Sequence, residues 1–398
     1  MRVLLALICA STLALCNTLV TASPVRKPYI VSYDGAVDDL CDALESTTKQ
    51  MNNFHCLWHL KIKCRRRMRF ARLFAVFAND NELNALRACV PTLDFEEDVE
   101  VFSQGVSSWS SWASDRLNSR DGLDGKSLPR DPPEDGYGSI VHVYLLDTGV
   151  RRTHVEFKDQ AFGRGVDLVD DDAEPDDCDG HGSHVASTIN QIAYSGKTVL
   201  HSVRVLDCHG NGELSGLIEG LEWVLGVATP SEPAVVSLAL GVRDGIWSRA
   251  LERVVQTLTG RGVFIVCAAG NQKGDACAIS PGNVAETLTV AASDSTDAPY
   301  AYGNSGRCVD LFAPGVQILG ACGGSTACEH PSDTAYAFQS GTSMAVAHAV
   351  GAATRVLMFS PRMSPENLKK HFTSTASRDK IRGGSLLPGT PNLLLYVK

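Results

Sequence analysis

One stretch of the 398-residue sequence constrains the fold more than any other, the run from Gln339 to Gly351. It places a serine among small residues and continues as an Ala- and Gly-rich segment that is apolar on every side, which is typical of a helix buried in a large core. The first turn of such a helix has unpaired N–H groups and the positive end of the dipole, so negative charge developing beside Ser343 would be stabilised. Alone, this stretch leaves open whether Ser343 is a nucleophile or part of a packing helix.

Three upstream segments carry side chains that could act together with Ser343. An apolar, β-branched run ends in Asp147, which predicts a strand buried on both faces with a catalytic group at its carboxyl end. His181 lies between two glycines at the start of another small-residue helix, and Asn271 follows a second buried strand. Each of them alone could be structural, since a strand-end Asp caps loops and a lone His often packs in a core. Together, in the order Asp, His, Asn, Ser, they are the groups that acyl transfer requires.

The sequences around these residues resemble subtilisin-type serine proteases (peptidase S8), in particular the proteinase K branch. Four motifs carry the resemblance: Asp147-Thr148-Gly149, Gly180-His181-Gly182-Ser183-His184, Ala268-Ala269-Gly270-Asn271 and Gly341-Thr342-Ser343-Met344-Ala345. The resemblance implies a serine endopeptidase with a catalytic triad. In that mechanism Ser343 attacks the peptide carbonyl, His181 transfers the proton and Asp147 orients the imidazole. The Asn271 amide and the Ser343 N–H would form the oxyanion hole.

The order of strand and helix patterns predicts the fold class and the domains. From residue 140 onward apolar strands alternate with helices, which predicts an α/β fold with a parallel sheet and helices on both faces. The strands are expected at 140–146, 199–206, 234–240 and 263–269, and the helices from 182, at 215–226 and at 246–259. Before them, residues 24–104 predict a small α+β unit. Its strands are expected at 29–33, 70–77 and 99–102, and its helices at 38–51 and 81–89. This unit resembles the inhibitor-type (I9) propeptide of subtilisins.

We therefore expect a signal peptide at 1–22, a propeptide at 23–104 and a subtilisin-like catalytic domain at 105–398. Met1 and Arg2 precede an apolar run with the shape of a secretory signal, and small residues permit cleavage after Ala22, so secretion is expected. By resemblance, autocleavage follows the last propeptide strand, which we place between Gln104 and Gly105. The propeptide tail would be the first substrate, present at high effective concentration, and the propeptide an intramolecular chaperone and inhibitor.

Charge and hydropathy limit the possible partners. The formal net charge of -9 gives no basis for nucleic-acid binding, and no stretch after the N-terminal run predicts a membrane span. Protein or peptide substrates are the expected partners, and the chain is expected to be a monomer. The basic run at 64–70 is interpreted mainly as a solvated loop, with a processing site or an anionic-surface contact as alternatives. The acidic run at 170–179 is also interpreted mainly as a solvated loop, with calcium binding or a preference for basic substrates as alternatives.

Disulfides are the expected state of the cysteines in a secreted chain. Zinc is not expected, because closely spaced Cys or His pairs do not recur at zinc-finger spacing. Proteinase-K-like relatives carry cysteines at matching places, which implies the pairs Cys178–Cys208, Cys277–Cys308 and Cys322–Cys328. Cys267 is then left alone inside the strand before Asn271 and is interpreted as a buried, inert thiol.

The resemblance also implies a substrate-binding segment and a calcium ligand. Ala239-Leu240-Gly241 would line the S1 pocket, where an extended peptide would pair as an added strand. Val242 stands where relatives often have glycine, which would narrow or re-aim that pocket. Asp310 matches an aspartate that binds calcium in proteinase-K-like folds, with backbone carbonyls near Ala285 and Thr287. The chemistry requires no cofactor, and structural calcium stays open.

A second function stays open as well, a self-cleaved, propeptide-bound protein that acts by binding a partner, with little activity in trans. The segment Cys308–Gly315 and Ala347, which replaces the usual proline, look like the atypical proprotein convertase that regulates the low-density-lipoprotein receptor. Against this function, Met344 keeps the ordinary family sequence, and no Cys-rich domain follows before Lys398. The expected function is therefore the active, secreted endopeptidase.

Overall fold

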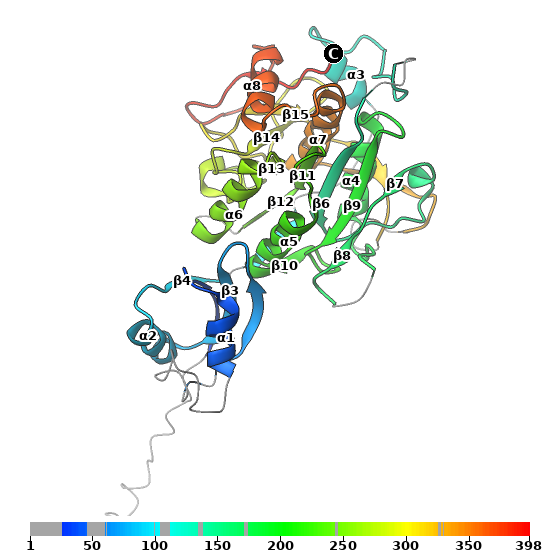
Figure 1. The fold of residues 1–398 in the computed structure, drawn as a ribbon. Helices are drawn as coiled ribbons and strands as arrows, with labels where there is room; N and C mark the ends of the chain where they lie inside the picture. Colours follow the sequence, from blue (N-terminus) through cyan, green and yellow to red (C-terminus); the bar gives the residue numbers. More distant parts are fainter. Residues whose placement is uncertain are drawn as a thin grey trace, which may run out of the picture.

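The computed structural model describes residues 26–45, 60, 62–98, 100–103, 112–133, 138–170, 174–242, 246–324, 328 and 330–398. They form a large unit after residue 112 and a smaller N-terminal unit packed against it (Figure 1). The expected signal peptide at 1–22 and the expected cut between Gln104 and Gly105 lie outside the described residues.

A ten-stranded sheet forms the centre of the large unit, in the order β18-β19-β15-β14-β13-β11-β6-β9-β7, with β8 also paired to β9. All neighbouring strands run parallel except β18 and β19. The strands are β6 (Val141–Asp147), β7 (Ala161–Phe162), β8 (Val166–Asp167), β9 (Thr198–Arg204), β11 (Ala234–Leu238), β13 (Phe264–Ala268), β14 (Leu288–Ser293), β15 (Leu311–Pro314), β18 (Ser377–Arg378) and β19 (Leu393–Leu394). The central strands are buried on both faces, as their continuous apolar runs predicted.

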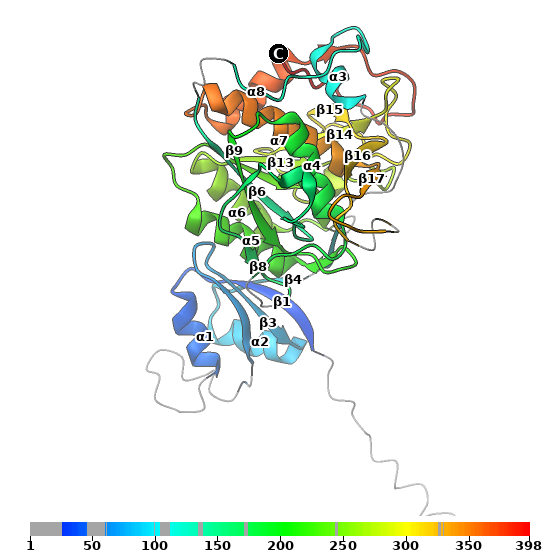
Figure 2. The same ribbon diagram turned by 90° about the vertical axis from the view of Figure 1, so that its right-hand side faces the viewer.

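Helices cover both faces of this sheet (Figures 1 and 2). One face carries α4 (His181–Ile192), α7 (Thr342–Phe359) and α8 (Pro365–Thr375), and the other carries α5 (Leu214–Val227) and α6 (Arg249–Gly260). Strand β6 contributes alternate residues to the two cores. Val143 and Leu145 pack in the core that includes α4 and α7. Tyr144 and Leu146 pack in the core that includes α5 and α6. The α/β fold with helices on both faces is thus confirmed.

Helix α7 is the centre of the large core, as the Ala- and Gly-rich run predicted. Residues 342–355 are all buried. Among the described residues it is also the one helix long and apolar enough to cross a membrane, but 89% of its apolar window is buried inside the protein. Its hydropathy is therefore explained by the core. Shorter elements complete the large unit: α3 (Ala113–Asn118), η1 (Val155–Phe157), η2 (Ala276–Ala278), β16 (Ile318–Ala321) and β17 (Tyr336–Gln339).

The N-terminal unit is an antiparallel sheet in the order β2-β3-β1-β4 with two helices and a core of its own. Its elements are β1 (Lys27–Ser32), α1 (Val37–Glu45), β2 (Cys64–Met68), β3 (Leu73–Ala78), α2 (Asp80–Cys89) and β4 (Asp94–Glu97). A capping box of Asn79 and Glu82 starts α2. A disulfide joins Cys41 of α1 to Cys64 of β2. The expected α+β unit is present, although β2 and β4 were not predicted and part of the expected helix 38–51 lies outside the described residues.

The prediction of a solvated loop at 64–70 was wrong for residues 64–68, while residues 69 and 70 do form an exposed turn. Residues 64–68 form β2, and Arg67 is surrounded by the carboxylates of α1, namely Asp38, Asp42 and Glu45. Arg66 forms an ion pair with Glu219 of α5 in the large unit. Acidic partners on other elements neutralise the run, which a local count of charge does not reveal.

A last strand of the N-terminal region, β5 (Glu100–Ser103), joins the large unit. It pairs antiparallel on one side with β10 (Asn211–Glu213) and on the other with β12 (Leu240–Val242), which gives the order β10-β5-β12. The register places Ser103 opposite Leu240 and Val101 opposite Val242. The chain thus supplies its own extended segment between two strands of the large unit.

Candidate active site

The side chains of Asp147 and His181 form a buried pair at the carboxyl edge of the sheet. Asp147 ends β6, His181 begins α4, and their Oδ1 and Nδ1 atoms are 2.7 Å apart. Burial alone would lower the pKa of His181, but the carboxylates of Asp147, Asp179 and Asp177 more than offset burial, so its pKa is raised. The other imidazole nitrogen, Nε2, is buried and has no hydrogen-bond partner among the described residues. His181 is therefore oriented by one nitrogen and has the other available for proton transfer.

Asp177 holds the start of α4 against the end of β6. Its carboxylate accepts hydrogen bonds from Thr148 Oγ1 and from three backbone N–H groups, those of Asp179, Gly180 and Ser183. Thr148 Oγ1 in turn accepts from the Gly182 N–H at 2.9 Å. These bonds use N–H groups that the first turn of a helix leaves free, and they fix His181 relative to Asp147. Gly180 precedes the helix with φ 109°, a conformation that glycine adopts readily.

The interpretation of the acidic run at 170–179 as a solvated loop holds for the exposed Asp170, Glu174 and Asp176, but it was wrong for Asp177 and Asp179. Asp177 and Asp179 are buried, and burial raises the pKa of Asp179 to about 6. Asp170 forms an ion pair with Arg204 at 2.5 Å. The interpretation missed Asp177 as a positioning residue. The available signal was an Asp shortly before a helix start, where carboxylates accept from free N–H groups.

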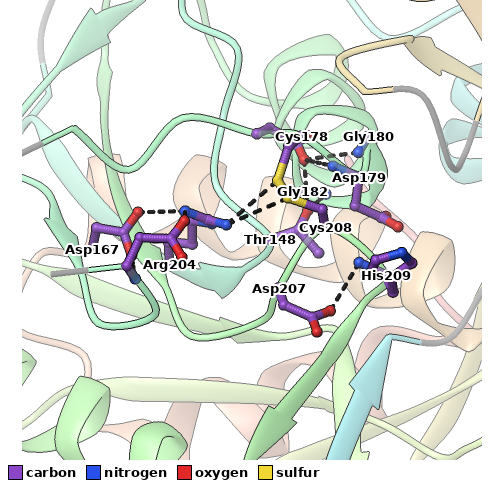
Figure 3. Close-up of a disulfide and its surroundings, with 12 residues drawn as sticks. Thr148, Asp167, Cys178, Asp179, Gly180, Gly182, Arg204, Asp207, Cys208 and His209 are labelled. Atoms are coloured by element: carbon purple, nitrogen blue, oxygen red, sulfur yellow. Dashed lines mark hydrogen bonds and ion pairs between the residues drawn. A yellow bond between two sulfur atoms is a disulfide. The ribbon is translucent and has the colours of Figure 1, made fainter. Parts of the chain in front are cut away.

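A disulfide fastens the segment before His181 to the loop before β10 (Figure 3). Cys178 is bonded to Cys208, and Nη2 of Arg204 lies 3.4 Å from the Cys178 sulfur. Helix α4, which begins with His181, is thereby linked to the loop that leads into β10, one of the two strands that flank β5. The other two expected pairs, Cys277–Cys308 and Cys322–Cys328, are also bonded.

Asn271 lies beside the start of α7, next to Ser343. Its side-chain oxygen accepts hydrogen bonds from Thr342 N at 3.0 Å and from Thr342 Oγ1 at 3.1 Å. Because the oxygen of this amide accepts from Thr342, the residue before Ser343, the Nδ2 group is the part of the Asn271 side chain that can donate. The hydroxyl of Ser343 donates to the backbone oxygen of Ala239 at 2.8 Å. The structure thus brings the predicted nucleophile, the predicted oxyanion donor and the predicted substrate segment together.

The predicted substrate segment overlaps β12, one of the two strands that pair with β5. Leu240 and Val242 are buried in the core shared with α5 and α6, so the Val242 side chain packs in that core. Gly241 alternates with them, and a Cβ there would lie 2.9 Å from Ile279 Cγ2. The Val242 N–H donates to the Ser280 oxygen at 2.9 Å, which anchors the neighbouring segment along the cleft.

The comparison with protein families decides the class of this site. Residues 138–389, which include every residue of the predicted triad, match the family model described as the subtilase family, Peptidase S8. The chain belongs to the subtilase family.

Known proteins agree with this assignment. The extracellular serine proteinase of Thermus sp. (strain Rt41A) is 38% identical over 326 residues, which cover 81% of this subtilase and 74% of that protein. Alkaline serine exoprotease A of Vibrio alginolyticus is 38% identical over 328 residues, which cover 81% of this chain and 58% of that protein. Proprotein convertase subtilisin/kexin type 9 of Rattus norvegicus is 35% identical over 321 residues, which cover 76% of this chain and 43% of that protein.

Solved structures give the same class. The crystal structure of a cold-adapted subtilisin-like serine proteinase has a TM-score of 0.62 and 39% sequence identity, and the match covers 73% of this chain and 98% of that chain. This subtilase is therefore a serine endopeptidase with a subtilisin-like fold.

The calcium ligands expected in this subtilase do not fit a metal ion as they are arranged. Asp310 Oδ2 lies 2.8 Å from Nζ of Lys369, on α8. The same ammonium group donates to the backbone oxygens of Ala285 at 3.0 Å and of Thr287 at 2.7 Å. Lys369 therefore engages all three oxygens that the resemblance assigned to calcium.

His184, His348 and the free cysteine Cys267 of this subtilase have structural positions, and for Cys267 this agrees with the expectation of a buried, inert thiol. His184 is buried, its Nε2 bonds the oxygens of Ile318 and Ala337, and burial lowers its pKa to about 3. His348 is buried with Nδ1 on the Met344 oxygen, and burial lowers its pKa to about 4. Cys267 is a buried free cysteine, and burial raises the pKa of its thiol to about 12, so the thiol is not a nucleophile.

Proposed function

We propose that this subtilase is a secreted endopeptidase made as a self-processing zymogen, with Asp147, His181 and Ser343 as its catalytic triad. Ser343 Oγ attacks the peptide carbonyl carbon and gives its proton to Nε2 of His181, which passes it to the leaving amine. Asp147 holds the imidazole in the required tautomer and stabilises the imidazolium. The N–H of Ser343 and the Nδ2 group of Asn271 stabilise the tetrahedral oxyanion.

The position of β5 is the observation that carries the proposal. Residues 101–103 pair with 242–240 in order, so one further step of the same register predicts position 104 opposite Ala239. The backbone oxygen of Ala239 is 2.8 Å from the Ser343 hydroxyl. A bond after Gln104 would therefore come to the nucleophile, which supports the cut between Gln104 and Gly105.

Contacts between the two units support a propeptide role for the N-terminal unit. Asp98 accepts a hydrogen bond from the N–H of Ser215, in the first turn of α5, at 2.7 Å. Glu96 bonds Ser248, the N-cap of α6, and accepts from the Ala250 N–H at 3.2 Å. Carboxylates at helix N-termini satisfy free N–H groups and favour the dipole. The unit would thus stabilise α5 and α6 during folding while its tail blocks the cleft.

Secretion is supported by two observations. Disulfides join Cys178 to Cys208, Cys277 to Cys308 and Cys322 to Cys328 in the large unit, and Cys41 to Cys64 in the N-terminal unit, and disulfides persist in oxidising compartments. A matching relative is named as an extracellular proteinase. We infer that the N-terminal segment 1–22 directs the chain into the secretory pathway.

The test expresses three versions of the full chain, the wild type, Ser343→Ala and a control, Ser374→Ala. Ser374 is an exposed residue near the end of α8, and its hydroxyl bonds the His371 oxygen. The N-terminus of each secreted product is sequenced, and digestion of an unfolded protein is measured. We expect the wild type and the control to start at Gly105 and to digest the protein, and Ser343→Ala to remain uncut and inactive.

Two results would overturn the proposal in different ways. Cleavage at Gln104 without digestion of any added protein would favour the self-cleaved binding protein. Cleavage and digestion that persist in Ser343→Ala would show that another residue is the nucleophile.

A further inference from the structure

The site of Lys369 is built like a cation site. Asp310 Oδ2 and the backbone oxygens of Ala285 and Thr287 converge on its Nζ atom at 2.7 to 3.0 Å. One carboxylate and two carbonyls are the oxygen ligands that hard cations such as Ca²⁺ use in proteins. An ammonium group has three donors, so Lys369 is matched one to one with these acceptors.

Asp310 and Thr287, which supply two of the three oxygens, are also held by hydrogen bonds that do not involve the lysine. Asp310 Oδ2 also accepts from the Thr289 N–H at 2.8 Å. Thr287 is fully buried, and its hydroxyl bonds Val284 O at 2.9 Å. The three oxygens, which we call the cage, thus come from the segment that leads into β14 and from Asp310 in the loop before β15. The ammonium group that binds them comes from α8.

The cage lies at one end of a segment that reaches the cleft. Ser280 accepts from the N–H of Val242 in β12, and Gly282 O accepts from the Thr289 hydroxyl at 2.6 Å. Residues 280–289 therefore run from the edge of the substrate strand to the lysine site. A cation is needed there because, without one, the Asp310 carboxylate and two carbonyl oxygens would face one another in a partly buried place.

We propose that Lys369 is an internal replacement for a metal ion, so that this site is independent of Ca²⁺ in the natural chain and becomes a Ca²⁺ site when Lys369 is shortened. The adjacent Lys370 offers a matched control. It is exposed, and its ammonium pairs with Glu366 on the same helix. The proposal does not depend on the catalytic assignment, because its readouts are thermal stability and metal binding.

The test measures the melting temperature of the secreted chain in EDTA and in Ca²⁺, for the wild type, Lys369→Ala and Lys370→Ala. Each of these three proteins is also made with Asp310→Asn. The effect of Ca²⁺ on the melting temperature that disappears with Asp310→Asn is the effect that depends on Asp310. Weak extracellular Ca²⁺ sites have Kd near about 1 mM, so about 10 mM Ca²⁺ should raise the melting temperature of Lys369→Ala by roughly 3 °C. The wild type and Lys370→Ala should show no Asp310-dependent rise.

Isothermal titration with Ca²⁺ should show one additional site in Lys369→Ala. If that variant is not secreted, Lys369→Gln serves in its place. Either of two results overturns the proposal: an Asp310-dependent Ca²⁺ response in the wild type, or the absence of that response in the lysine variant.

Discussion

Acid should destabilise this subtilase through His184, and the structure gives the size of the effect. The imidazole is fully buried, and its pKa is lowered to about 3 by burial, against about 6.5 in an unfolded chain. Below pH 6.5 the unfolded state therefore binds a proton that the folded state does not bind. The free energy of unfolding falls as the pH decreases from about 6.5 toward 3.

The magnitude follows from the pH interval. Between pH 7 and pH 5 the unfolded imidazole becomes protonated while the folded one stays neutral, which costs about 2 kcal/mol at about 1.4 kcal/mol per unit below 6.5. For a domain of this size that corresponds to a fall in melting temperature of about 4 to 8 °C. His184→Gln keeps an N–H donor for the Ile318 and Ala337 oxygens but cannot titrate.

The assay is thermal unfolding at pH 7 and pH 5 for Ser343→Ala with and without His184→Gln, since an inactive background prevents self-digestion. Other groups titrate equally in both proteins, so the difference between the two falls isolates His184. We expect the fall to be smaller by about 2 kcal/mol in the variant. Equal falls would refute the reasoning, because they would mean that His184 has the same pKa in the folded and unfolded states.

Three other predictions concern the site and its support. Asn271→Ala should lower kcat by about 10²–10³ with little change in KM, measured on a peptide substrate, and an unchanged kcat would exclude its oxyanion role. Replacing Cys178 and Cys208 by serine removes a bridge with a sequence separation of 30 and should cost about 3 to 4 kcal/mol, measured by denaturant unfolding. Burial against the large unit raises the pKa of Asp98, so the bound state takes up a proton more readily than the free state. The N-terminal unit should therefore bind the large unit more strongly as the pH falls from neutral. Asp98→Asn should weaken that pH dependence, measured by the amount of N-terminal unit that copurifies.

The features that the sequence predicted correctly are those with a local pattern. Helix α7 follows from an uninterrupted run of small apolar residues, and β6 from a continuous β-branched run. Asp147 and His181 were chosen as candidates because one ends such a run and the other starts a helix, and the structure places their Oδ1 and Nδ1 atoms 2.7 Å apart. The alternation of strand and helix patterns was enough to predict a parallel sheet with helices on both faces.

The features that were missed depend on contacts between distant residues. Arg67 can lie in a strand instead of a solvated loop because carboxylates on α1 neutralise its charge. These carboxylates are 22 to 29 positions away in the sequence. Lys369 reaches the Asp310 oxygens from a helix that starts 55 positions later, at Pro365. A sequence pattern does not show which distant residues will come into contact. Arg67 and Asp310 were therefore interpreted without their ion-pair partners.

The order β10-β5-β12 also has a consequence for the solubility of this subtilase. In that three-stranded sheet β10 and β12 each pair with β5 and not with one another. When β5 leaves, two strand edges face each other across a gap of one strand, and their backbone groups are free to pair with any extended chain. Such edges are also templates for aggregation. As long as β5 stays in place, it would protect the protein from pairing edge to edge with its own copies.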